Sequence, residues 1–124
     1  MSDPKLPDYL EHIRQAATDA CGFVTGLSQD EFIADRRTQL AVIMSLVIIG
    51  EAATRLMDRY PEFVEPHPDI PWQSMRGMRN RIAHGYFDLQ ADIVWRTVQT
   101  DLPQLLARLA ALQGGNDGRS GSPR

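Results

Sequence analysis

Apolar residues recur at intervals of three and four positions along most of the chain, which is the period of an amphipathic helix. This spacing predicts a first helix over about residues 7–27 and a longest helix over about residues 36–60. It also predicts a helix from about Pro71 to Gly85 and a last long helix over about residues 91–112. No segment alternates as a strand would. The pattern therefore indicates an all-α fold, an antiparallel up-down helical bundle of four main helices plus short helical segments.

Local signals mark where several of these helices begin or bend. Ser28 and Glu31 have the spacing of a capping box that opens a short helical segment, and Asp35 can cap the longest helix. Four prolines make residues 61–71 a stiff connection with little room for a helix. Because Pro103 has no N–H group to donate, we expect a kink in the last helix at that position.

The longest predicted helix is apolar on nearly every side at its centre, where residues 40–49 read LAVIMSLVII. A helix of this kind lies inside a bundle, or in a bundle and a dimer interface at once. This run of ten residues is half of the roughly 20 that a bilayer requires, so we expect no membrane span.

The 124 residues suit one domain, which we place at residues 1–112, followed by a glycine-rich polar tail at 113–124 that we expect to be disordered. A net charge of −3 argues against broad, charge-driven binding of nucleic acid and leaves room for a local basic patch. Cys21 is the only cysteine, so no internal disulfide can form, and we expect a buried thiol in a reducing cytoplasm.

The local basic patch is the stretch Trp72–Tyr86, which has three arginines and a histidine but no acidic residue. On a helix, Arg79 projects near the middle of the apolar face, between Met75 and Ala83. An unpaired charge in that place would be strongly unfavourable, so Arg79 requires a partner. His84 projects about 140° away from Arg79 on the same helix, so the two side chains point well apart.

Arg79 and His84 can converge in two ways: the long arginine side chain can curl round the helix, or a two-fold symmetric dimer can bring two copies of the helix together. We favour the dimer, which would also give Arg79 an interface. Glu51, at the edge of the apolar run, is a candidate counter-charge for Arg79. The simpler interpretation of Glu51 is a surface ion pair with Arg55, four positions later, and both interpretations of Glu51 remain open at this point.

The side chains of Arg79, Asn80 and His84 together suit a phosphodiester. A guanidinium grips phosphate oxygens as a fork, an amide orients them, and an imidazole moves protons near neutral pH. The chain has no H-E-x-x-H or C-x-x-C spacing and no glycine-rich phosphate loop. We therefore expect neither a metal nor a cofactor.

Arg79, His84 and Tyr86 match the R-x4-6-H-x-Y signature of HEPN-domain ribonucleases. The signature alone is weak, but it lies within a longer ordered series over about residues 8–112 that resembles the HepT-like toxins. That series consists of Gly50–Ala52, Ile70–Trp72, Arg76–Tyr86 and Asp92–Pro103.

The resemblance implies a HEPN-like bundle that cleaves RNA without a metal, with the 2′-hydroxyl as internal nucleophile. It implies a homodimer whose catalytic site straddles the two subunits and contains Arg79 and His84. Asn80 and Glu51 would support that site. Arg76 and Arg81 are candidates for positioning RNA, with solvated helix faces as the alternative interpretation of both.

Tyr86 has a further role in this resemblance. In HepT-like systems the tyrosine of the H-x-Y motif is adenylylated by a cognate nucleotidyltransferase antitoxin, which silences the toxin. The alternative for Tyr86 is a half-buried aromatic beside the helix end. The implied partners are thus an RNA such as tRNA or mRNA, a second copy of the chain, and the antitoxin. Two other functions stay open: a non-catalytic module that binds RNA or nucleotide, and a structural partner of a nucleotidyltransferase.

Overall fold

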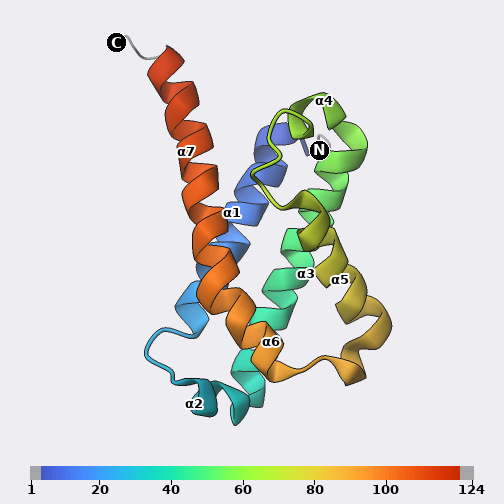
Figure 1. The fold of residues 1–124 in the computed structure, drawn as a ribbon, viewed down its shortest axis with the longest axis vertical. Helices are drawn as coiled ribbons and strands as arrows, with labels where there is room; N and C mark the ends of the chain where they lie inside the picture. The colour runs from blue at the N-terminus through green and yellow to red at the C-terminus, as the bar shows by residue number, and fades with distance from the viewer. Residues whose placement is uncertain (1–3, 121–124) are drawn as a thin grey trace.

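The structure, a computed structural model, describes residues 4–120, and the side chains of residues 4–112. Over this range it contains helices and no strand, so the predicted all-α class is confirmed. Figure 1 shows the long helices running alternately down and up in chain order, as an antiparallel bundle requires. These helices are α1 (Leu6–Phe23), α3 (Arg36–Arg59), α5 (Trp72–Gly85) and α7 (Leu102–Ser120).

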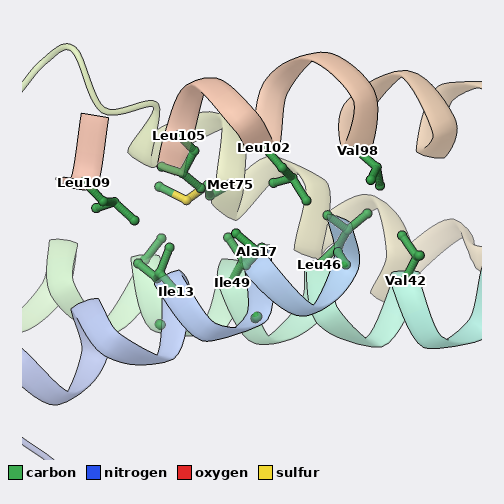
Figure 2. Close-up of a cluster of buried hydrophobic side chains, with 14 of the residues drawn as sticks. Ile13, Ala17, Val42, Leu46, Ile49, Met75, Val98, Leu102, Leu105 and Leu109 are labelled. Carbon is green, nitrogen blue, oxygen red and sulfur yellow. The ribbon is translucent and has the colours of Figure 1, made fainter. Parts of the chain in front are cut away.

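Helix α3 is the centre of the bundle, with α1 packed along one side and α5 along the other, while α7 packs on α1. Figure 2 shows how α7 closes the core, with Leu102, Leu105 and Leu109 pointing towards the helix α1, which carries Ile13 and Ala17. Leu46 and Ile49 of α3 and Met75 of α5 fill the space between them, and all of these side chains are at most 7% exposed. Burial of such side chains is the main favourable term in folding.

Both predicted caps are present. The Glu31 N–H donates to Ser28 Oγ (3.1 Å) and the Ser28 N–H donates to Glu31 Oε1 (2.8 Å), which opens α2 (Gln29–Ile33). Asp35 accepts the Thr38 N–H at Oδ1 (3.1 Å) and the Thr38 hydroxyl at Oδ2 (2.7 Å), which opens α3. These side-chain oxygens satisfy amides that have no partner inside the helix.

Two connections differ from the predictions. The first helix ends at Phe23 and not near Leu27, because the chain turns through Gly26, whose φ of 82° is left-handed and suits a glycine. A short helix, α4 (Pro61–Val64), lies in the stretch predicted to have little room for one. Pro61 is its first residue, where the missing N–H costs nothing.

The last predicted helix is present in two parts. α6 (Ala91–Arg96) is followed by a π-helical turn, Thr97–Asp101, and then by α7. The predicted kink at Pro103 is thus a widened turn just before the proline, since a regular α-helix would press the proline ring against the carbonyl of Gln99.

At the end of the chain, α7 continues through residues 113–120 and so extends into the predicted tail. Residues 121–124 of the predicted tail lie outside the described residues.

By length and composition alone, α3 would meet the criteria for a membrane span, with a mean hydropathy of 1.8 over its most apolar window. The apolar stretch is therefore longer than the ten residues counted from the sequence. A core helix meets the same criteria, and α3 lies between α1 and α5 with a buried face that includes Leu46, Ile49 and Leu56. Packing against α1 and α5 therefore accounts for the buried part of its apolar surface.

Candidate active site on helices α3 and α5

The candidate site begins with the close crossing of α3 and α5 at Gly50. A Cβ atom on Gly50 would lie 2.3 Å from Arg79 Cβ and 2.7 Å from the Met75 carbonyl oxygen. Neither distance is tolerated between real atoms, so only glycine permits this approach. The crossing places the stem of Arg79 directly against α3, next to Glu51.

Glu51 is the counter-charge of Arg79. Arg79 Nη1 donates to Glu51 Oε2 at 2.6 Å, and the two side chains are 23% and 45% exposed. Among residues 4–112 no ion pair joins Glu51 to Arg55, so the simpler interpretation of Glu51 was wrong. The guanidinium is thus paired within one chain and remains partly open to solvent.

Thr54 and Asp58 extend this contact along α3, one and two turns after Gly50. The Thr54 hydroxyl donates to the Gly50 carbonyl (2.8 Å) and lies within 3.4 Å of Arg79 Nη2 and 3.5 Å of Arg76 Nε. Arg76 Nη2 also pairs with Asp58 Oδ1 at 3.2 Å. Both arginines are therefore held against α3 by a series of oxygen atoms.

The sequence reasoning missed Gly50, Thr54 and Asp58 as parts of this arrangement. A signal was present, since the three recur every four residues on the helix that carries Glu51. It could not be connected to α5 without knowing which faces of the two helices meet. Arg79 Nε is buried and has no hydrogen-bond partner within the described structure, so the guanidinium keeps one donor unused.

His84 lies apart from this pair of arginines. It is exposed near the end of α5 and lines a hollow of about 300 Å³ with Arg81 and Asp88. In the described part of the chain, no hydrogen bond joins His84 to Arg79, and the hollow that His84 lines does not include Arg79. The structure therefore does not bring the two predicted catalytic residues together in one subunit. Asn80 is exposed as well.

Tyr86 follows the end of α5 directly. Gly85 is the last residue of α5, and the chain continues as a 3-10 turn, Tyr86–Asp88. Gly85 has a φ of −148°, so it is not a left-handed cap. The half-buried Tyr86 lines a hollow of about 240 Å³ together with Arg36 of α3.

Other candidate groups do not join the site. Burial raises the pKa of the half-buried Cys21 thiol, which keeps it protonated and a weak nucleophile. Within residues 4–112 no three His, Cys, Asp or Glu side chains gather as metal ligands would.

Comparison with known proteins identifies relatives of this chain. A family model described as "Ribonuclease HepT-like" matches residues 13–112. The chain is 37% identical over 106 residues to "Probable ribonuclease HepT" of Thermococcus cleftensis, covering 86% of this chain and 94% of that protein. It is 38% identical over 97 residues to "Putative RNase TTE0752" of Caldanaerobacter subterraneus subsp. tengcongensis, covering 78% and 84% of the two chains.

No solved structure matches the chain. The family model covers most of the chain, including α3, α5 and the whole R-x4-H motif. The matched regions also cover 94% and 84% of the length of the two relatives. The chain therefore belongs to the HepT-like ribonuclease family.

Proposed function

We propose that this protein is a metal-independent endoribonuclease that acts as the toxin of a toxin–antitoxin system in the cytoplasm. The observation that carries the proposal is the fixed, partly exposed guanidinium of Arg79, held by Glu51 and Thr54 inside the R-x4-H motif. Family membership and the ribonuclease names of the relatives support the same reaction class.

The reaction needs three groups around one phosphate. A base removes the proton of the 2′-hydroxyl, an acid protonates the leaving 5′-oxygen, and a cation stabilises the charge of the phosphorane. Arg79 suits the third role, and the exposed His84 suits the first or second. One subunit holds these residues apart, so the proposal requires a second copy of the chain to complete the site.

The surface of α3 supports such a homodimer. Leu40, Met44 and Ile48 are spaced by four residues and are 42%, 58% and 41% exposed, so they form an apolar stripe on one face. We call this the α3 stripe. It ends one turn before Glu51, so a second copy packed on it would lie beside the Arg79–Glu51 pair.

Cleavage of RNA in the presence of a chelator tests the proposal. Wild-type protein should cut single-stranded RNA and leave 2′,3′-cyclic phosphate ends, while His84→Ala should lose at least about 10²-fold in rate. Cleavage that survives the loss of His84, or that stops when the chelator is added, would overturn the mechanism.

The same assay separates the two alternatives. A non-catalytic module would bind RNA in both proteins and cut it in neither. A structural partner of a nucleotidyltransferase would not bind RNA at all. Mapping of RNA ends after brief expression would then identify the target, whether tRNA or mRNA.

We also propose that the antitoxin, a nucleotidyltransferase, adenylylates Tyr86. The Tyr86 oxygen would attack the α-phosphate of ATP, with loss of the hydroxyl proton and release of pyrophosphate. The bound phosphate and adenosine would compete with RNA by bulk and charge. Arg36 lines the hollow beside Tyr86 and would be a nearby cation for the new phosphate. Mass spectrometry after coexpression should find the AMP adduct on wild type and not on Tyr86→Phe, and an unmodified but fully inhibited protein would contradict this proposal.

A further inference from the structure

A hollow of about 440 Å³ lies between α1 and α3, on the other side of Glu51 from Arg79. On α3 the hollow is lined by Ile48, Glu51, Arg55 and Arg59, which are spaced by three and four residues. These residues therefore lie on the same face of the helix as the α3 stripe. Beyond Ile48 that face changes from apolar to charged. The polar side chains of the hollow are Tyr9 and His12 of α1 and Glu51, Arg55 and Arg59 of α3.

The charges in this hollow do not balance. Among the described residues that line the hollow, the only carboxylate is that of Glu51, and Arg79 already pairs with it at 2.6 Å from the α5 side. Arg55 is exposed and forms no ion pair within residues 4–112. The described lining of the hollow therefore carries two guanidinium groups and one carboxylate that is already paired.

One of its guanidinium groups is also held in place. Arg59 Nη1 donates to the hydroxyl of the buried Tyr9 at 3.0 Å, a contact between α3 and α1. Tyrosine is neutral, so this bond orients the guanidinium without cancelling its charge. A cation fixed before its ligand arrives loses less entropy on binding.

The hollow adjoins the proposed active site through Glu51, which lines the hollow and pairs with Arg79. A nucleic-acid strand with one phosphate at Arg79 would thus carry a neighbouring phosphate towards Arg55 and Arg59. We propose that this hollow is a second phosphate-binding subsite, which holds RNA beside the phosphate that is cleaved. The subsite rests on the proposed ribonuclease function.

Binding of a short, labelled single-stranded RNA at a series of salt concentrations tests the subsite. The measurements use His84→Ala protein, so that the RNA stays intact. Each lost contact to a phosphate lowers the slope of log K against log salt by about 0.7 for a single strand. Arg55→Met should show that decrease and bind several-fold more weakly at low salt, and Arg55→Lys should restore the slope.

The matched control is Arg96→Met, an exposed arginine on α6, which lies at the end of the molecule away from α4. It removes the same charge and should keep the slope of the parent protein. Thermal melting checks that each variant is folded, and Arg59→Lys against Arg59→Met provides a second, independent pair for the same hollow.

An unchanged slope in both Arg55→Met and Arg59→Met would overturn the subsite while leaving the ribonuclease proposal intact. RNA binding that depends on Arg55, in a wild-type protein that cuts no RNA, would overturn the ribonuclease and leave Arg55 as a phosphate contact of a non-catalytic RNA-binding module. Absence of RNA binding by the His84→Ala parent would overturn the subsite, and a wild-type protein that also cuts no RNA would overturn the ribonuclease as well.

Discussion

Arg79 is the residue on which the candidate site depends. Its guanidinium donates to Glu51 and lies near the Thr54 hydroxyl, while its Nε is buried without a partner. A partly buried ion pair of this kind is weak grounds for stability, because loss of hydration offsets the attraction between the charges. The contacts instead restrict the direction of the guanidinium, which matters more for binding a phosphate than for folding.

Replacing Glu51 tests this interpretation. Glu51→Ala should lower the free energy of unfolding by only about 1 kcal/mol, since both partners are partly exposed to solvent. A guanidinium displaced by about 1 Å should cost about 10²-fold in RNA cleavage. Glu51→Gln keeps an acceptor at the same position and should recover part of the rate. Equal cleavage by Glu51→Ala and wild type would contradict a positioning role.

Asp35 offers a prediction about pH. The hydrogen bond from the Thr38 hydroxyl, followed by that from the Thr38 amide, lowers the pKa of the Asp35 carboxyl. A lowered pKa in the folded state adds stability above the pKa of the unfolded chain. That stability is lost as the pH falls through the folded value. Asp35→Asn can still cap the helix, but its side chain cannot titrate. As the pH is lowered, the urea concentration at the midpoint of unfolding should therefore fall less steeply for Asp35→Asn than for wild type.

At the scale of the elements, the approach of α3 and α5 decides where Arg79 lies. The two helices are held together partly by burial of Met75 and Ile82 on α5 against the core. Gly50 sets the distance between them, because any side chain there would meet Arg79 Cβ. The position of a functional group thus depends on a residue that has no functional group.

Gly50→Ala should therefore push the helices apart. Overpacking of this type costs about 1–3 kcal/mol, and the shift of Arg79 should also reduce RNA cleavage. Gly77→Ala on α5 is the matched control, since a Cβ there would have no other atom within 4 Å. Alanine is the better helix former, so Gly77→Ala should stabilise by about 0.5–1 kcal/mol. Chemical unfolding measures the stability of both variants. A Gly50→Ala protein as stable as wild type would contradict the close crossing of α3 and α5.

At the scale of the whole molecule, the outer face of α3 has two halves. The α3 stripe is apolar and suits a second copy of the chain, whereas the part beyond Ile48 is charged and borders the hollow with Arg55. In the proposed dimer the apolar half would join the subunits, and the charged half would stay open to RNA. This division explains why one helix is both strongly apolar and close to a basic hollow.

Met44→Glu places a charge in the middle of the α3 stripe. The side chain is 58% exposed, so the change should leave the fold of the monomer intact. If the stripe joins two copies, the variant should be monomeric by light scattering and should lose RNA cleavage. The control is Phe23→Glu, which places the same charge at an exposed phenylalanine on α1. This variant should remain dimeric and should still cleave RNA. A Met44→Glu protein that remains dimeric would place the interface elsewhere.

Local signals in the sequence were sufficient for the main helices of this fold, but not for the short helix α4 or the π-helical turn. The helices follow from the apolar period, and the caps at Ser28 and Asp35 were readable because each cap contacts a residue three positions later. Such contacts form within one helical turn, so they depend on short stretches of sequence alone. The family motif on α5 could also be identified from the sequence.

The partners of the charged side chains were decided only by the tertiary structure. Glu51 meets Arg79 across 28 positions and Tyr9 meets Arg59 across 50, and each contact joins two different helices. Which oxygen reaches which guanidinium depends on how the helices cross, and that follows from packing over the whole core. The sequence by itself therefore determined the helices, the motif and the divergence of His84 from Arg79 on one helix, while the pairing of Arg79 with Glu51 and the hollow at Arg55 required the folded chain.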